Sequence, residues 1–252
     1  MTTWTPGERL FAQYAHAPNA LGFCGPSAAE GLLLGARGGH PDLDVTAVAQ
    51  GFSGAWPYQQ IIAQLAGRPN PLEAEVVRAY WTGNALTRSI GPEAFLTALL
   101  DRFRPQAARY WEHLTDDLLP EVAATHAFHV LAIYPWSRLL PAGPEALTVL
   151  ESCRIGWGVV EAVGDQPAGH RVVEVRQPVL AYDGTLTLTE PELRTVTDDG
   201  FAGEVRPGDT VALHWGRICD RLSADDTAEL EHWTRWQLDA SNPRIAAASE
   251  CA

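Results

Sequence analysis

The sequence contains no lysine, so all 18 of its basic residues are arginines. They face 31 acidic residues, which gives the chain a formal net charge of -13. An excess of negative charge repels phosphate backbones and anionic membrane surfaces, so nucleic acid is not an expected partner. The lack of lysine, with abundant Ala, Gly, Pro and Arg, indicates a GC-rich genome and not a mechanism.

Cysteine is also scarce, and the four thiols stand far apart at positions 24, 153, 219 and 251. There is no CxxC pair, and no charged segment followed by an apolar one opens the chain, so neither a disulfide framework nor a secretory signal is indicated. No apolar run approaches the roughly 20 residues that a membrane-spanning helix requires. We therefore expect a cytoplasmic protein with reduced thiols.

The common cofactor and catalytic signatures are missing as well. The sequence has no GxGxxG, Walker A, HExxH, GxSxG or kinase motif, which disfavours an ordinary enzyme. With 252 residues, of which 46% are hydrophobic and nine are Trp, the chain is long enough for two domains with separate cores. A change of pattern near residue 150 predicts an α+β protein, with an all-α domain over 1–150 and a β-barrel domain with a C-terminal helix over 151–252.

Capping signals and hydrophobic spacing predict the helices of the first part. A capping box at Thr5 and Glu8 predicts a first helix from about Pro6 to Ala17. The clearest amphipathic stripe follows Pro92 and predicts a helix that ends at Phe103. Further helices are predicted over 45–52, 56–66, 72–81, 106–119 and 145–152.

Cys24 lies in a tight predicted loop, just ahead of a second apparent capping box that begins at Ser27. The positive end of a helix dipole would favour its thiolate and make the residue reactive. A thiol-dependent enzyme that uses Cys24, with His129 as a base, is therefore one functional hypothesis. The alternative is a small buried residue in a turn.

His126 and His129 are three residues apart in an apolar stretch. On a helix they would share a face and could both bind a metal, but no carboxylate stands at the spacing of a zinc or di-iron site. Histidines that pack with satisfied hydrogen bonds are the alternative. Cys24, His126 and His129 together form a possible second metal site.

The stretch from Cys153 to Leu222 consists of short β-rich runs separated by turns, which predicts a small β-barrel. Its last strand is Thr210–His214, and alternation places the histidine on the face away from the core. If the first strand begins just after Cys153 and pairs near the last, the thiol and the imidazole would meet at one end of the barrel, open to solvent or to a docking protein. Such a pair could hold iron or another transition metal.

Two features complete the second part. Cys219 follows the last predicted strand and is either a third soft ligand or a packing residue. A polar-capped helix is predicted from Ala224 to about Ala240, ended by Asn242 and Pro243.

The order of these residues resembles the small hydrogenase-maturation chaperones of the HypC/HupF type. The resemblance rests on Cys153, on Gly158 five positions later, on the Gly-Asp-x-Val-x-x-His-x-Gly run that contains His214, and on the capped helix that follows. It implies an OB-like barrel, an iron-cofactor intermediate as cargo, the hydrogenase large subunit or maturation proteins as partners, and Cys153 with His214 as the working pair. Cys153 is internal here, and Trp157 stands where that family has Pro.

The whole chain also resembles an uncharacterised actinobacterial family associated with [NiFe] hydrogenase gene neighbourhoods. The matching stretches are 21–26, 55–58 and 128–130. The resemblances favour an accessory or maturation protein for a [NiFe] hydrogenase. The thiol-dependent enzyme and a non-catalytic interaction module remain the alternatives.

Overall fold

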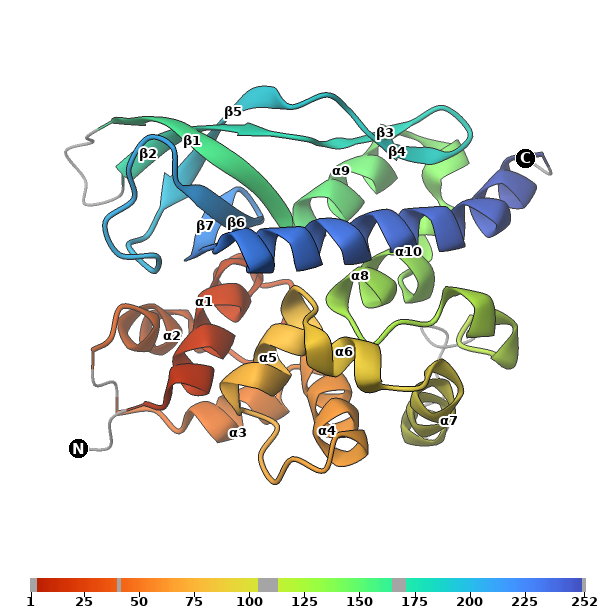
Figure 1. Cartoon of the computed structure of the whole chain (residues 1–252), viewed down its shortest axis with the longest axis horizontal. Coiled ribbons are helices and arrows are strands. Elements are labelled where there is room, and N and C mark those ends of the chain that lie inside the picture. Colours follow the sequence, from red (N-terminus) through yellow and green to blue (C-terminus); the bar gives the residue numbers. More distant parts are fainter. Residues whose placement is uncertain (1–3, 40–41, 104–112, 165–170, 251–252) are drawn as a thin grey trace.

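The computed structural model describes residues 4–39, 42–103, 113–164 and 171–250. Helices from the first part of the chain form one layer and a β-barrel forms the other, and a long C-terminal helix runs along the boundary between them (Figure 1). The protein is therefore of mixed helix and strand type, with a closed barrel and a C-terminal helix, as the sequence predicts. Within the described ranges, no helix is both long enough and apolar enough to span a bilayer.

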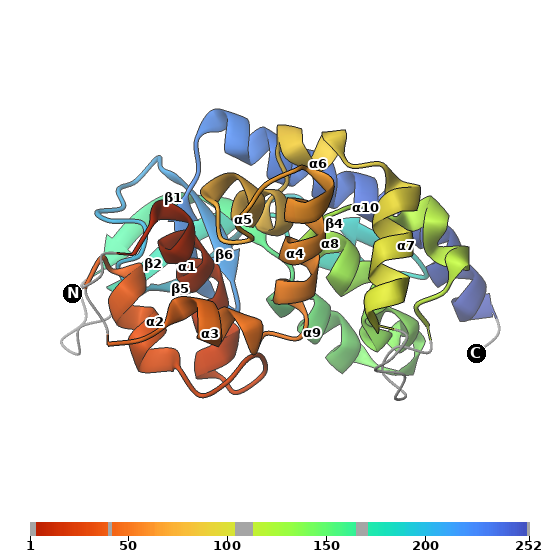
Figure 2. The ribbon, with the colours of Figure 1, turned by 90° about the horizontal axis from the view of Figure 1, so that it is seen from below.

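The helices from the first part of the chain gather below the barrel in Figure 1 and are seen from their own side in Figure 2. They are α1 (Pro6–Ala20), α2 (Ala29–Ala36), α3 (Val45–Gln50), α4 (Ala55–Leu65), α5 (Ala74–Trp81), α6 (Ala85–Ser89) and α7 (Pro92–Phe103). The Thr5–Glu8 capping box forms as predicted, and α7 has the predicted bounds with its apolar stripe buried.

Short turns lead from this layer to the barrel. They are η2 (Asp116–Glu121), α8 (His126–Phe128), the π-helical turn η3 (His129–Ile133), η4 (Pro135–Arg138), η5 (Leu140–Ala142) and finally α9 (Pro144–Cys153). Part of the helix predicted over 106–119 lies outside the described residues. The α-helix predicted for the rest of that range is wrong, because 116–121 forms a 3-10 turn. Pro120 in this turn has no backbone N–H to donate to an α-helical hydrogen bond.

The strands are β1 (Gly156–Gly164), β2 (Arg171–Gln177), β3 (Leu180–Tyr182), β4 (Leu186–Leu188), β5 (Glu192–Asp198), β6 (Thr210–His214) and β7 (Arg217–Arg221). Five of them close a barrel in the order β1-β2-β5-β7-β6, and β3 and β4 form a separate hairpin. Strand β7, which the sequence analysis missed, pairs parallel with β5 and antiparallel with β6. It closes the barrel beyond the strand that was predicted to be last.

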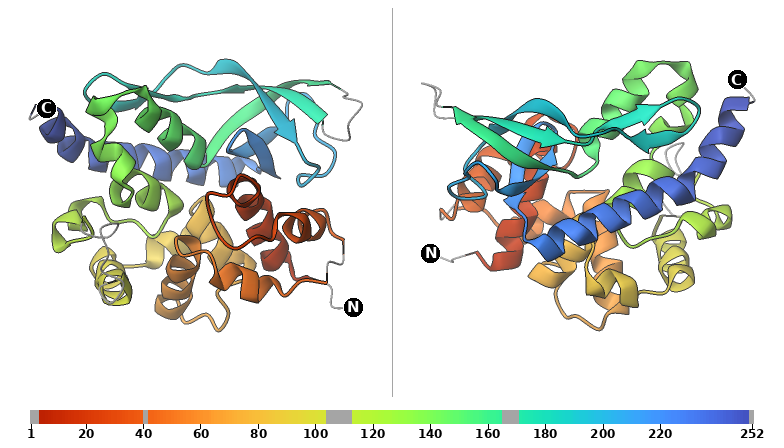
Figure 3. Two further views of the ribbon diagram at one scale, coloured as in Figure 1. Left: turned by 180° about the vertical axis from the view of Figure 1, so that it is seen from behind. Right: turned by 45° about the horizontal axis from the view of Figure 1, so that its top comes forward.

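The final helix, α10 (Ala224–Glu250), passes the residues that were predicted to end it (Figure 3). Asn242 exchanges two hydrogen bonds with the backbone of Leu186 in β4, at 2.8 and 2.9 Å. Arg244 makes a paired contact with the carboxylate of Glu121 at 2.7 and 3.0 Å. These tertiary contacts offset the backbone hydrogen bond that Pro243 removes, so the predicted end near Ala240 is wrong.

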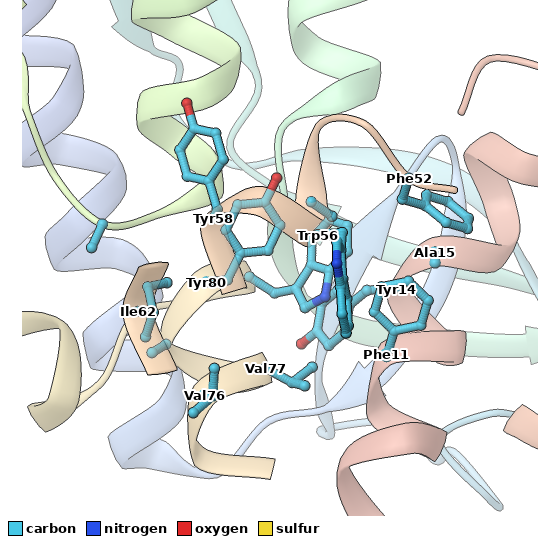
Figure 4. Packing of buried hydrophobic residues seen from close by; sticks show 14 of the residues in the cluster. Phe11, Tyr14, Ala15, Phe52, Trp56, Tyr58, Ile62, Val76, Val77 and Tyr80 are labelled. Atoms are coloured by element: carbon cyan, nitrogen blue, oxygen red, sulfur yellow. The ribbon is translucent and has the colours of Figure 1, made fainter. Parts of the chain in front are cut away.

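The main core does not stop where strands replace helices. Its buried residues include Phe11, Tyr58 and Tyr80 from the helices, together with Trp157 and Cys219 from the strands. Figure 4 shows the part contributed by α1, α4 and α5, in which the hydroxyl ends of Tyr58 and Tyr80 point the same way. The helical layer and the outer face of the barrel thus share one interior, and the division into domains at residue 151 stays a prediction.

Candidate metal centre

One end of the barrel is fixed to the end of α9. Strands β1 and β6 pair antiparallel with Gly156 opposite Leu213, and the backbone N–H of Trp215 donates to the carbonyl of Ser152 at 2.9 Å. These bonds place Cys153, the last residue of α9, beside His214, the last residue of β6. The structure therefore brings the thiol and the imidazole together at one end of the barrel, as the sequence predicts.

A third donor reaches this point from α8. Thr125 caps the turn, and His126 is its first residue. The π-helical turn η3 follows directly, and such turns occur frequently at functional sites. One ligand atom from each of His126, Cys153 and His214 lies within 4.8 Å of the other two, and all three residues are buried. We call these three residues the donor cluster.

The hydrogen bonds of His214 fix its tautomer. Its Nδ1 lies 2.8 Å from the backbone carbonyl of Tyr14. A carbonyl only accepts, so Nδ1 carries the proton and Nε2 keeps a free lone pair. That Nε2 is buried and has no hydrogen-bond partner in the part of the chain that the structure describes. A buried acceptor left in this state is costly unless something else occupies the space beside it.

His126 uses both of its ring nitrogens. Nε2 donates to the carbonyl of Cys153 at 2.9 Å, and Nδ1 accepts from the hydroxyl of Tyr80 at 3.0 Å. Burial, followed by the proximity of His214 and His129, lowers the pKa of His126 well below its ordinary value. Burial also lowers the pKa of His214 to about 4. The hydrogen bond to the Tyr14 carbonyl opposes this shift, as does the nearby Cys153 carbonyl, although its geometry makes no hydrogen bond with Nε2. Both imidazoles are therefore neutral near pH 7.

A cavity of about 20 Å³ lies at the donor cluster. This is enough space for a single water molecule or one ion, and not for an organic ligand. Its wall includes all three members of the donor cluster and also Cys24 and His129. The two sites that the sequence analysis kept apart, Cys153 with His214 and Cys24 with His126 and His129, are thus parts of one cavity.

The thiol of Cys153 is not at an open mouth of the barrel. Its residue is only 5% exposed, and burial raises its pKa, an effect that the indole of Trp215 opposes. The prediction that His214 points away from the barrel interior is confirmed, but the residue does not reach solvent. The helical layer covers that outer face, so the imidazole is buried as well, with 2% of the residue exposed.

Cys24 differs from its predicted setting. The capping box at Ser27 is wrong: α2 begins at Ala29, and Ala28 precedes it without a capping side chain. The Cys24 loop is held instead by Asn19, whose amide donates to the carbonyls of Cys24 and Pro26 at 2.8 and 2.6 Å. Burial raises the pKa of Cys24, against a hydrogen bond with Tyr134, which disfavours the thiolate near neutral pH.

His129 lies at the side of the cavity next to α4. Its Nδ1 is 3.3 Å from the hydroxyl of Tyr58, and burial lowers its pKa to about 3. A Cβ at Gly54 would come within 2.9 Å of His129 Nε2, so only glycine allows the ring this position. Cys219, by contrast, packs in the main core and does not line the cavity, which favours its packing role. Cys251 lies outside the described residues.

Sequence reasoning missed the residues that orient the two imidazoles. Tyr14 acts through its backbone carbonyl, which any residue could provide, so no sequence signal identifies it. Tyr80 acts through its hydroxyl. A tyrosine where a helix predicts a buried apolar side chain is a weak signal, because a buried hydroxyl requires a partner.

The donor cluster fits a transition-metal ion in chemistry and nearly in spacing. Nitrogen and sulfur donors at about 2.0 and 2.3 Å from a tetrahedral zinc ion stand roughly 3.3–3.6 Å apart. Donors within 4.8 Å of one another would close on an ion by side-chain movements of about 1 Å. Two imidazoles and one thiol are the donor types that suit zinc, iron, copper or nickel.

Comparison with known proteins adds the family and no function. No curated protein and no solved structure matches the chain. The model of the family of unknown function DUF6390 matches residues 3–248, which is nearly the whole chain. The protein therefore belongs to this family.

Proposed function

We propose that this protein binds one transition-metal ion at the donor cluster and serves as an accessory protein in the maturation of a [NiFe] hydrogenase. The observation that carries the metal site is the buried Nε2 of His214, which has no hydrogen-bond partner among the described residues. It lies beside a thiol, a second imidazole and a cavity the size of one ion. The hydrogenase role is supported by the resemblance of the Cys153 and His214 motifs to the HypC/HupF chaperones. The closed barrel with its following helix is consistent with an OB-like module of that kind.

In this proposal the ligand atoms are His214 Nε2, Cys153 Sγ and a ring nitrogen of His126. The Tyr14 carbonyl keeps the proton of His214 on Nδ1, which is the arrangement that metal-bound histidines generally have. If His126 binds through Nε2, its proton moves to Nδ1 and is donated to the Tyr80 hydroxyl oxygen. The resemblance names iron as the metal, and the donors are equally suited to the other ions named above.

Metal binding would displace a proton from the thiol. Burial keeps Cys153 protonated and both imidazoles neutral near pH 7, so we expect release of about one proton per ion. Calorimetry in buffers of different ionisation enthalpy measures this number. Release of two or more protons would contradict the assigned protonation states.

The loop that holds Cys24 connects the cavity wall to the protein surface. Phe23, which is 61% exposed, stacks on Trp215 with ring centroids 4.4 Å apart. Cys24 itself lines the cavity and has a thiol that could serve as a further ligand. Among the described residues that line the cavity there is no carboxylate, so Cys153 would supply the one negative charge among the three cluster ligands.

The metal site is tested by metal analysis of the purified protein after exposure to Fe(II), Zn(II) or Co(II). We expect one ion per chain, and a thiolate-to-cobalt absorption band that Cys153→Ser abolishes. Cys219→Ser is the matched control, because Cys219 is equally buried but lies outside the cavity. A protein that retains no ion, or a cobalt spectrum that survives Cys153→Ser, would overturn the site.

The hydrogenase role needs a separate test. Co-expression with a hydrogenase large subunit or a maturation protein should give a complex that Cys153→Ala and His214→Ala lose and Cys219→Ala keeps. A complex insensitive to both cavity variants would leave the barrel as a non-catalytic interaction module. For the thiol-enzyme alternative, the corresponding readout is selective alkylation of Cys24 near neutral pH, and its raised pKa disfavours that result.

A further inference from the structure

A second and larger cavity lies on the other side of His214. It is an open cleft of about 390 Å³ between α9 and the adjoining ends of the barrel strands. Such a volume is typical of sites for small organic ligands, unlike the single-ion cavity of the donor cluster. His214 lines both cavities, but the cleft has its own polar groups, so binding of a ligand there does not require a metal.

Arg154 is the most unusual of these groups. It is a charged residue with only 2% of its side chain exposed. Nε and Nη2 donate to the two carboxylate oxygens of Glu151 at 2.8 and 3.0 Å, and Nη2 also donates to the carbonyl of Pro178 at 2.6 Å. Its Nη1 is buried and has no acceptor anywhere in the described ranges. Nη1 carries two N–H donors, and a buried donor without an acceptor costs free energy. A bound ligand with an acceptor atom would remove that cost.

The space next to Nη1 is kept open by a glycine. A Cβ at Gly156 would stand 3.5 Å from Nη1 of Arg154 and 3.4 Å from Oε1 of Gln177. Both of these side chains line the cleft, as does Gly156 itself. The missing side chain thus leaves room at a point where a guanidinium and an amide face the same small volume.

The charges of the cleft favour an anionic group. The carboxylate of Glu151 is fully engaged, since it also accepts from the backbone N–H of Leu180 at 2.7 Å, and it balances only Arg154. Arg194 lines the cleft as well, with a half-exposed side chain that pairs with Glu192. A buried donor with a second guanidinium nearby matches the geometry of a carboxylate.

The remaining wall is apolar. Val179, Leu180 and Val196 line the cleft beside the polar end, and such surface gains free energy when a hydrocarbon group covers it. We propose that the cleft binds a small organic carboxylate with an apolar tail against this wall. One carboxylate oxygen accepts from Arg154 Nη1. The other accepts from Gln177 Nε2 once the amide turns, because Oε1 faces this space in the structure.

The test uses 4-phenylbutyrate as probe and its uncharged counterpart 4-phenylbutyramide as the matched ligand. Titration of the isotope-labelled full-length protein, followed by NMR, should show the carboxylate binding at least tenfold more tightly than the amide. The shifted signals should be those of Arg154, Gln177 and their neighbours. Equal binding of the two probes, or no shift in the cleft, would overturn the proposal.

Gly156→Ala is the decisive variant. Its Cβ meets its neighbours at 3.4–3.7 Å, which is ordinary contact, so we expect the fold to stay intact while the methyl group occupies the space at Nη1. Affinity for 4-phenylbutyrate should fall at least tenfold, and Arg206→Gln, on an exposed side chain outside the cleft, should leave it unchanged. An unaltered affinity in a folded Gly156→Ala protein would refute the site. Arg154→Gln is a second variant, with the same fall expected.

Discussion

The two sides of strand β6 border very different environments. Inside the barrel, the described residues form an aliphatic cluster of Val160, Val173, Val175, Val196, Val205, Val211, Leu213 and Ile218. The opposite side of the same strand faces imidazoles, a thiol and phenols. Because side chains alternate along a strand, Leu213 enters the first environment and His214 the second. The barrel's interior is thus used for packing, and its chemistry lies outside, under the helical layer.

The largest difference expected between the two environments is in how pH changes the free energy of unfolding. In the metal-free protein, burial holds the pKa of His129 at about 3 and that of His214 at about 4. The unfolded chain takes up these protons first, as the pH falls below about 6.5. Stability is therefore complete above pH 6.5 and is lost as the pH falls toward the folded-state values. Between pH 7.5 and 5 we expect a loss of roughly 2 kcal/mol for each histidine, measured by urea unfolding.

The aliphatic side chains that pack inside the barrel do not titrate, so a change among them should leave this pH dependence intact. His126, whose pKa is also lowered, adds to the loss. His214→Gln should therefore reduce the loss by the share of one histidine, roughly 2 kcal/mol, whereas a variant of the interior should keep it whole. A stability that does not change between pH 7.5 and 5 would mean that the imidazoles are charged or solvated, contrary to their burial.

A cavity cut into the barrel interior should affect stability and leave metal binding alone. Ile218 is completely buried there, and Ile218→Ala should lower the free energy of unfolding by about 2–5 kcal/mol. Metal affinity of the folded variant, measured by competition with a chelator, should match that of the wild type. A large loss of affinity would show that the two environments are coupled across β6.

Removal of the Tyr80 hydroxyl should have the opposite effect, weakening metal binding strongly and stability only slightly. Tyr80→Phe leaves the ring in the core but takes away the oxygen 3.0 Å from His126 Nδ1. Loss of such an orienting contact typically weakens metal binding about 10–100-fold, while stability should fall by only about 1 kcal/mol. Tyr58→Phe, which acts on His129, is the matched control, and equal effects of the two variants on affinity would argue against His126 as a ligand.

The smallest effect is expected for Cys219→Ala. Its sulfur packs in the main core, so the change should cost on the order of 1 kcal/mol and should not alter metal stoichiometry. The readouts are thermal unfolding and metal analysis. Any loss of bound metal would restore Cys219 as a ligand.

Two features of the site could be predicted from the sequence: the direction of the His214 side chain and its proximity to Cys153. Alternation in β6 set the direction of His214, and pairing of the first and last predicted strands set its distance from Cys153. The sequence did not predict that His126 would join them, because that contact depends on packing of α8 across the barrel end. It also gave no reason for α10 to pass Pro243, which contacts with β4 and η2 explain.

The main wrong prediction from the sequence was an open site, because the structure buries both Cys153 and His214. This difference also arises from packing between distant segments of the chain. A residue that leaves the inner face of a barrel is exposed only if nothing covers the outer face. Here α1 and α5 supply that cover, through Tyr14 and Trp81 beside His214. The sequence indicated those helices but carried no signal for where they pack.

X-ray absorption spectroscopy of the metal-loaded protein tests the central claim most directly. For zinc, the account predicts one sulfur ligand at about 2.3 Å and two or more nitrogen ligands at about 2.0–2.1 Å, with the sulfur lost in Cys153→Ser. A first shell of oxygen and nitrogen alone, or a sulfur that persists in Cys153→Ser, would contradict it.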